Sequence, residues 1–424
     1  MRLGYPLPPY SSQILGRLAA HFALATLGVS CAAGLLGCHP HSREIVSSSA
    51  VESDLPEPLK SELSASEKPS PDRVLHASQA ASLAIWYGDA SLAGRELDVA
   101  IAEIETLYTG TDSDAAEARR LYHEEREKPF KGEPYERLMV YLYRGLLDYG
   151  AGDYSNAAAS FRSAILQDAF ADEQQNQCDF EVVEYMLARA VMRSGGDQHL
   201  VNDAFERARA LGTIHKTTVP TLKPTDNVLL FVEVGPSPFK VGQGESDELL
   251  VVGRRAKDGM HALVSVDHGE QFRTEETGNL AFQAMTRGGR QFDFLLAGKA
   301  YTKQLSQQSG LTINQIGTAL SFTVPVVGAP IQLAGLIVTA SGIGIKPQAD
   351  TRYWKALPDS IHIIPLQLSV GHHQVRIQFR NQFDKHLVSK DQRFSIDVGD
   401  QTRELLIWAS WGDLWPGRNL FFAS

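Results

Sequence analysis

Cysteine is scarce in this chain, whose 424 residues include only Cys31, Cys38 and Cys178. Three cysteines cannot form the dense disulfide framework that holds small secreted domains together. Hydrophobic residues make up 43% of the chain, so a core sufficient for two or three domains can form without disulfides. We therefore expect a fold that depends on packing, in which Cys178 is a small buried or half-buried hydrophobic residue.

Positive charge is also in deficit, because 40 Lys and Arg residues stand against 50 Asp and Glu residues, a formal net charge of -10 at pH 7. An acidic surface is repelled by phosphate backbones and by anionic lipid headgroups. We therefore expect that the protein binds no nucleic acid and does not dock on membranes through a basic patch.

Complete catalytic signatures are missing. A zinc-protease helix beginning at His123 would need a second histidine where Glu127 stands. A phosphate-binding loop ending at Lys299 would need Ser or Thr where Ala300 stands, and no Gly-x-Ser-x-Gly elbow is present. The sequence therefore predicts no catalytic residue and a function that is not enzymatic.

The histidines of the second half lack the spacing of metal ligands. Isolated histidines of this kind are more often surface residues or hydrogen-bonded core residues than ligands. We therefore predict no metal site and no cofactor at the six histidines between residues 261 and 386, namely His261, His268, His362, His372, His373 and His386.

The first 37 residues are typical of a signal peptide. Arg2 and Arg17 precede the uncharged apolar run Phe22–Leu36, which has the length of a signal-peptide core and is too short to span a bilayer comfortably. An uncleaved membrane anchor and an ordinary secretory signal are the alternatives for this segment.

The apolar run ends in the sequence LLGC at residues 35–38, which resembles the lipobox of bacterial lipoproteins. This resemblance implies cleavage after Gly37 and attachment of lipid to Cys38, so that the folded part lies in the cell envelope outside the cytoplasm. His39 follows the cysteine, and by analogy with lipoprotein sorting it favours the outer membrane, facing the periplasm, in a host with two membranes. Residues 38–72 are rich in Ser, Glu and Pro, and we predict that they form a disordered tether.

Residues 73–215 have the apolar periodicity of helices, interrupted by glycine-containing turns. One stretch resembles the tetratricopeptide signature, in which small residues let two helices approach closely: Gly145, Gly152, Tyr154, Ala157, Phe161 and Ala164. Ala188, Gly196, Phe205 and Ala208 resemble a degenerate second copy. The resemblance implies a helical repeat domain that binds partner proteins, and a generic helical bundle is the alternative.

Three further segments are similar to landmarks of a family of uncharacterised bacterial envelope lipoproteins, which have tetratricopeptide-like repeats and a C-terminal β-rich domain. The segments are FKGEPYER at residues 130–137, TRGGR at residues 286–290 and DTRYW at residues 350–354. The resemblance implies this domain order and an envelope location, and it implies no activity.

Short alternating or apolar runs predict strands in the rest of the chain, in a β-rich domain at residues 222–355 and a β-strand module at residues 356–424. The fold class expected is α+β, with helical repeats followed by a sandwich-like β-rich part. A run at residues 365–375 resembles the hairpin of surface-layer β-sandwich modules. The expected strands cover residues 227–234, 248–252, 261–266, 281–285, 361–368, 373–379, 393–398 and 403–408, and a helix is expected at 291–304.

A run of basic residues within the β-rich part is a candidate anion or interaction site: Arg287, Arg290, Lys299 and Arg352. Guanidinium groups bind carboxylates and phosphates through paired hydrogen bonds. The alternative is a lattice of salt bridges, in which Arg352 pairs with Asp293 or Asp350.

These observations favour a membrane-tethered envelope lipoprotein that acts as a non-catalytic scaffold for envelope proteins. Thr323–Val338 is strongly apolar and lies within a long uncharged stretch, so a membrane-active or oligomerising protein is the second hypothesis. Pro325 and Pro330 interrupt the run, which favours a buried or interfacial segment over a membrane span. An enzyme acting on envelope polymer is the third hypothesis.

Overall fold

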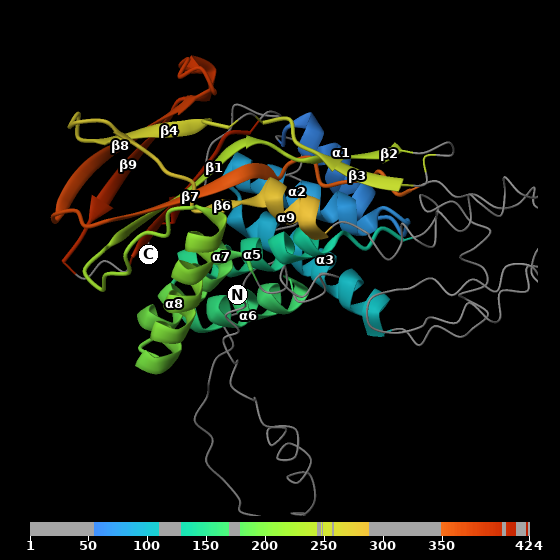
Figure 1. Cartoon of the computed structure of the whole chain (residues 1–424), viewed down its shortest axis with the longest axis horizontal. Coiled ribbons are helices and arrows are strands. Elements are labelled where there is room, and N and C mark those ends of the chain that lie inside the picture. Colours follow the sequence, from blue (N-terminus) through green and yellow to red (C-terminus); the bar gives the residue numbers. More distant parts are fainter. Residues whose placement is uncertain are drawn as a thin grey trace, which may run out of the picture. The chain divides into compact units, whose positions relative to one another are not determined.

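The computed structural model describes residues 55–109, 129–168, 179–243, 247, 249–256, 258–287, 349–400, 404–412 and 421–422. All of them belong to one compact unit that spans Asp54–Ser424 (Figure 1). Within the described residues the chain forms eight α-helices and three sheets. The α+β class predicted from the sequence is therefore confirmed.

The helices of the first half follow one another in space as they do in the chain. Each described helix from α1 to α8 contacts the next one, and short turns join the pairs α2–α3, α5–α6 and α7–α8. A later helix, α9, packs on α5. The helices are α1 (Glu57–Ser66), α2 (Arg73–Tyr87), α3 (Ala90–Thr109), α5 (Pro134–Gly150), α6 (Tyr154–Asp168), α7 (Glu181–Arg193), α8 (Gln198–His215) and α9 (Leu280–Arg287).

The helix α1 corrects one expectation. Residues 38–72 were predicted to be a disordered tether, and this is wrong for Glu57–Ser66, which form a helix packed on α2. Leu59 of this helix is buried, with 1% of its surface exposed. Composition did not reveal the helix because its few apolar residues become sufficient only when α2 supplies the surface that covers them.

The strands form a five-stranded sheet, here called the central sheet, a two-stranded hairpin, and a four-stranded sheet, here called the outer sheet. The central sheet has the order β11-β10-β1-β7-β6, the hairpin pairs β2 with β3, and the outer sheet has the order β5-β4-β8-β9. The strands are β1 (Val228–Pro236), β2 (Phe239–Gln243), β3 (Leu249–Gly253), β4 (His261–Val266), β5 (Phe272–Arg273), β6 (Gly278–Asn279), β7 (Pro358–Leu366), β8 (Gly371–Arg380), β9 (Gln392–Val398), β10 (Leu405–Ser410) and β11 (Phe421–Phe422).

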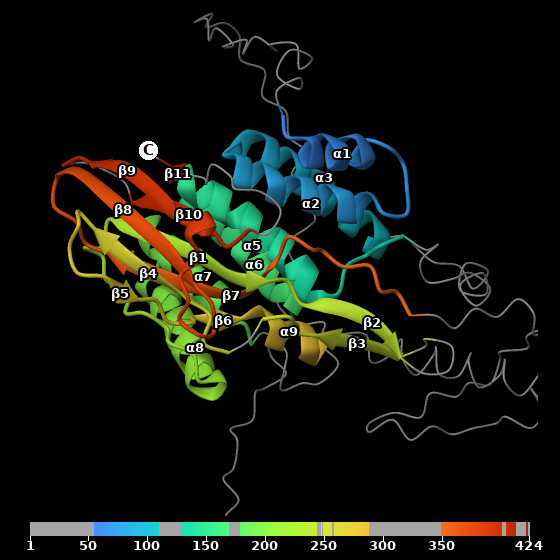
Figure 2. The ribbon, with the colours of Figure 1, turned by 90° about the horizontal axis from the view of Figure 1, so that it is seen from above.

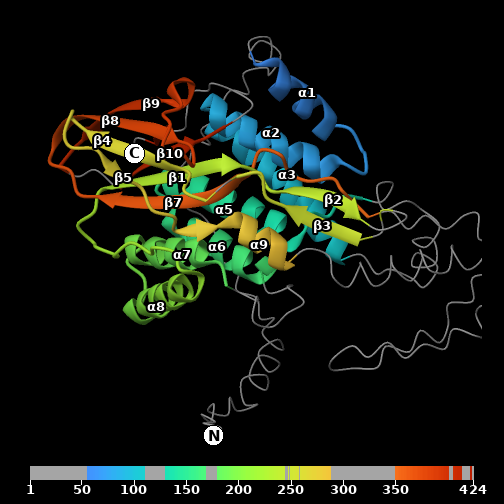
Figure 3. The same cartoon turned by 45° about the horizontal axis from the view of Figure 1, so that its top comes forward.

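The central sheet is covered on both faces, which explains why β1 is an almost uninterrupted apolar run. Leu229 and Phe231 of β1 pack in the same core as the helices. Leu230 and Val232 point to the opposite face and pack against the outer sheet. Figure 3 shows β1 and β7 between the helices α5–α8 on one side and β4, β8 and β9 on the other.

This layering differs from the predicted division into a helical domain, a β-rich domain and a C-terminal module. The strand β10 pairs in parallel with β1, and β7 pairs with β1 on its other side. The boundary predicted between residues 355 and 356 therefore does not separate two modules, since both segments supply neighbouring strands of one sheet. The boundary at residue 215 also crosses a shared core.

Two local predictions are wrong. Residues 281–285 were expected as a strand but lie in α9, because a short apolar run cannot distinguish a strand from a buried helix. The hairpin expected at residues 365–375 does not form, because β7 belongs to the central sheet and β8 to the outer sheet. The helix predicted at 291–304 and the apolar segment 323–338 lie outside the described residues. In the part of the chain that is described, no helix is long and apolar enough to span a membrane.

The small residues of the tetratricopeptide-like stretch lie where α5 and α6 cross. A Cβ atom added to Gly145 would come within 2.5 Å of a ring carbon of Phe161. Ala157 and Ala164 are fully buried on α6, and Tyr154 packs edge-on against Tyr149 with ring centroids 5.0 Å apart. Gly152 in the turn has a φ of 77°, a backbone conformation that favours glycine. The close approach of these two helices therefore depends on the absence of a side chain at residue 145.

Replacing Gly145 with alanine tests this dependence. Gly145→Ala should lower the free energy of unfolding by about 1–3 kcal/mol, because an extra methyl group overpacks the contact with Phe161. Gly94 on α3 is the control, since an added Cβ there would meet its nearest atom at 3.8 Å. Gly94→Ala should stabilise the protein by about 0.5–1 kcal/mol, the usual gain at a mid-helix glycine. Urea denaturation followed by circular dichroism measures both, and equal effects of the two variants would contradict the packing argument.

Candidate functional site

The structure places one side chain of the predicted anion site. Arg352 forms ion pairs with Asp350 at 2.7 Å and with Asp72 at 2.6 Å. The pair with Asp350 is one of those that the salt-bridge alternative predicted for this residue, and the pair with Asp72 was not foreseen. Arg287 is the last residue of α9, and its side chain is not described. Arg290 and Lys299 lie outside the described residues, as do Gly37 and Cys38.

Charged and hydroxyl side chains gather instead where the helices meet the central sheet and its hairpin. They form three buried clusters, which are named here after their central residues: the Lys240 cluster, the Glu233 cluster and the Glu404 cluster. Each one joins a helix of the first half to a β-segment far away in the sequence. Burial of charge is costly unless every group is paired, so these clusters are the candidates for function.

The Lys240 cluster brings together two of the sequence landmarks. Lys240 on β2 donates from Nζ to Oε2 of Glu136 at 2.7 Å, and the backbone N–H of Trp354 donates to Oε1 of the same carboxylate at 2.8 Å. Arg352 lies over the ring of Phe130, 5.5 Å from its centroid. Segments 130–137 and 350–354 therefore meet at the carboxylate of Glu136.

The electrostatics of the Lys240 cluster keep the amino group of Lys240 charged. Burial alone lowers the pKa of Lys240, but the neighbouring carboxylates of Glu136 and Glu133 outweigh it and raise the pKa. The ammonium group therefore stays charged at neutral pH. A lysine in this state is an ion-pair partner and not a nucleophile.

The Glu233 cluster contains a carboxyl group that titrates near neutral pH. Glu233 lies on β1 with 2% of its surface exposed, and the hydroxyl of Tyr143 on α5 donates a hydrogen bond to it. Burial raises the pKa of Glu233 to about 7, although polar groups of Tyr143, Ser410, Trp408 and Trp86 partly oppose the shift. A buried acid with this pKa is a common feature of catalytic sites and also of structural networks.

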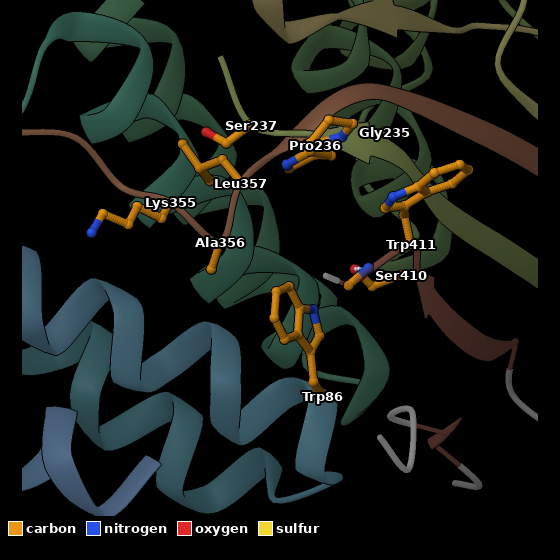
Figure 4. A pocket seen from close by; sticks show the side chains of 11 residues that line it. Trp86, Gly235, Pro236, Ser237, Lys355, Ala356, Leu357, Ser410 and Trp411 are labelled. Carbon is orange, nitrogen blue, oxygen red and sulfur yellow. Dashed lines mark hydrogen bonds between the residues drawn. The ribbon is translucent and has the colours of Figure 1, made fainter. Parts of the chain in front are cut away.

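A small pocket adjoins the Glu233 cluster at the carboxyl ends of the parallel strands β1 and β10 (Figure 4). Trp86, Ser410 and Trp411 line it, and Ser410 is seen between the two indole side chains. Lys355 also lines the pocket, but its amino group points away from the other side chains. The pocket volume of about 20 Å³ accommodates roughly one water molecule. This pocket is therefore too small for a substrate of ordinary size.

The Glu404 cluster is the most deeply buried. Arg189 on α7 and Glu404, the residue before β10, both have fully buried side chains, and the guanidinium forms a two-pronged ion pair with the carboxylate. Arg193 adds a second guanidinium, with Nε 2.8 Å from Glu404 Oε2. The hydroxyl of Tyr149 also donates to Glu404. Three groups on two helices thus hold one carboxylate that belongs to the sheet.

Two of the three clusters consist of charged groups that are paired with one another. Lys240 pairs with Glu136, and Arg189 and Arg193 pair with Glu404, whereas the partners of Glu233 include the hydroxyl groups of Tyr143 and Ser410. His362 is a buried histidine. Burial lowers its pKa to about 3, so its imidazole stays neutral. Its Nδ1 lies 2.8 Å from the hydroxyl of Thr274.

Four of the other five histidines of the second half have an acidic neighbour. His261, His372, His373 and His386 each lie within ion-pair distance of a different aspartate: Asp384, Asp397, Asp267 and Asp391. Among the described residues no group of three or more His, Cys, Asp or Glu side chains could hold a metal ion.

The residues at the centres of the clusters were missed by sequence reasoning. A signal was present for Glu233, which is the single charged residue of the run NVLLFVEV and would need a partner when that run is buried. The partner itself, Tyr143, lies on a distant helix and has no sequence signature. No family model, curated protein or solved structure matches the chain.

The pKa of Glu233 predicts a pH-dependent stability. The folded pKa of about 7 lies above the ordinary value of 4.5, so the folded state holds the proton more tightly and loses stability as pH rises between these values. The ionisation of Glu233 should therefore lower the free energy of unfolding by about 2–3 kcal/mol between pH 5 and pH 8. Glu233→Gln should remove this contribution, so the free energy of unfolding of the variant should increase relative to that of the wild type as pH rises.

Urea denaturation at several pH values measures this difference. Tyr143→Phe is the companion variant, because the loss of its donor should raise the pKa of Glu233 and extend the fall in stability to higher pH. Parallel stability curves for the wild type and Glu233→Gln would contradict the assignment.

The Glu404 cluster predicts a large cost when one partner is removed. Arg189→Met should destabilise the protein by about 3–5 kcal/mol, because it leaves a buried carboxylate without its main partner. Arg189→Met combined with Glu404→Leu should cost less than the sum of the two single variants. The exposed pair Arg209–Glu206 is the control, and Arg209→Met should change stability by less than about 1 kcal/mol. Thermal unfolding of the four variants decides, and additive effects at 189 and 404 would refute the coupling.

Proposed function

We propose that the protein is a lipid-tethered envelope protein that acts as a non-catalytic scaffold for other envelope proteins. The observation that carries the proposal is the engagement of the buried ionisable groups with one another. The Lys240, Glu233 and Glu404 clusters connect helices to strands, and the pocket that adjoins the Glu233 cluster accommodates roughly one water molecule. Such clusters serve to hold parts of a fold in one arrangement, as a scaffold requires.

The helix pairs support the same proposal. Tetratricopeptide-like pairs occur in proteins that bind other proteins, and α5–α6 has the close glycine contact that this likeness requires. The first helix of each of the last two pairs, α5 or α7, is buried along most of its length, and its inner side faces the central sheet. The sandwich-like β-rich part therefore takes up the surface of these helices that would otherwise grip a partner. The partner would contact the remaining surface of the protein.

The proposed location rests on the sequence. The apolar run before the LLGC sequence supports export, and Cys38 supports attachment of lipid. The chain between Cys38 and the helix α1 is shorter than the predicted tether, so the folded unit would be held nearer to the membrane than a tether reaching residue 72 would allow.

Crosslinking in intact cells tests the proposal. The wild type and Cys38→Ser are expressed at equal levels, crosslinked, fractionated and purified, and their captured proteins are identified. The wild type should fractionate with membranes and capture a defined envelope protein. Cys38→Ser should be released from membranes and lose that capture while keeping the melting temperature of the wild type.

Glu233→Gln is the matched control for an enzymatic function. A scaffold should keep its captured partner in this variant, whereas an enzyme that uses the Glu233 carboxyl would lose its cellular phenotype. Retention of Cys38→Ser in the membrane fraction would instead favour the hypothesis of a membrane-active protein. A wild type that captures no envelope protein would refute the scaffold.

A further inference from the structure

The outer sheet ends in a strand whose free side has no partner among the described residues. The order β5-β4-β8-β9 places β9 at the edge, and Figure 2 shows β9 on the outer side of β8. On the inner side β9 pairs with β8 from Gln392 to Val398. An edge of seven residues whose N–H and C=O groups have no partner in the described part of the chain is a template on which another strand can pair.

The side chains of β9 alternate between a buried and an exposed face. Phe394, Ile396 and Val398 are buried in the core shared with the central sheet. Arg393 and Asp397 are exposed on the opposite face, on either side of the exposed Ser395. The strand thus carries one positive and one negative charge at equal distances from its central residue.

Arg393 has an unfavourable neighbour within its own sheet. It lies directly opposite Arg376 on β8, and like charges in this position repel each other. Arg376 is compensated by Asp391 at 2.9 Å. Arg393 contacts no carboxylate of the described chain, so an acid supplied from the open side of β9 would relieve the repulsion.

We propose that the open edge of β9 binds the same edge of a second copy of this chain, antiparallel and centred on Ser395. This register places Arg393 of each copy opposite Asp397 of the other, so two ion pairs form across the junction. The same register places Phe394 opposite Ile396 of the other copy, a pair of apolar residues that suits a sheet. A two-fold axis requires such self-complementarity, in which each contact occurs twice.

Neighbouring registers lack this match. Moving the centre to Phe394 places Asp397 opposite Asp391 and Arg393 opposite Ser395, so two repulsive pairs replace two attractive ones. A parallel arrangement in the same register places Arg393 beside Arg393 and Asp397 beside Asp397. The distribution of charge on β9 therefore selects one orientation and one register, and it selects another β9 over an unrelated strand.

A cysteine at the centre of the junction tests the arrangement. The full-length chain carries Ser395→Cys in a background in which Cys31, Cys38 and Cys178 are all replaced with serine, is purified in detergent and is oxidised with copper phenanthroline. Directly opposite residues of antiparallel strands have Cβ atoms about 4.5–5.5 Å apart, close enough for a disulfide after small adjustments. We expect a covalent dimer on a non-reducing gel. Ser155→Cys, at an exposed position of α6, is the matched control and should stay monomeric.

Charge exchange then tests the register. On the Ser395→Cys background, Arg393→Asp alone and Asp397→Arg alone should each reduce crosslinking at least tenfold, because each places like charges opposite one another. The two together should restore it, while all three keep the melting temperature of the parent. Equal crosslinking of Ser155→Cys and Ser395→Cys, or single variants that crosslink like the parent, would overturn the proposal. These outcomes are independent of the scaffold function and of its envelope partner.

Discussion

The fold depends on the burial of charge between the helices and the central sheet. Glu404 lies fully buried beside Arg189, and neither ion could be accommodated without the other. Lys240 and Glu136 form an equivalent buried ion pair at the hairpin. Because each cluster draws its members from both halves of the chain, neither half has a satisfied interior alone. The central sheet and the helices therefore form one cooperative structure with a shared core.

Sequence analysis succeeded for the features that short stretches of the chain determine. Strands β1, β4, β8 and β9 follow from local patterns, because a strand covered on one face alternates and a strand covered on both is apolar throughout. The turns between helices also depend on local chemistry, as at Asp197, whose side chain accepts a hydrogen bond from the backbone of His199 at 2.8 Å. Each of these features is determined within about ten residues of chain.

The remainder could not be predicted because it is decided between distant residues. The run at residues 281–285 is too short for its period to be read, and packing on α5 makes it a helix. The clusters could not be predicted for the same reason. A lone Glu233 in an apolar run indicates that its carboxyl group needs a partner, but it does not identify that partner as Tyr143. Of the two partners of Arg352, Asp350 was predicted because it is close in the sequence. Asp72 was not predicted because it is distant in the sequence.

The parallel pairing of β1 with β10 has a consequence for how the protein reaches its folded state. Val228 is held beside Leu405, and nearly the whole second half of the chain lies between them. Closing so long a loop comes late, since its entropy must be offset before the contact forms. During synthesis β1 would therefore have a partner in β7 before β10 closed its other side. The central sheet thus lacks the covering of one side of its middle strand until Leu405–Ser410 have been made.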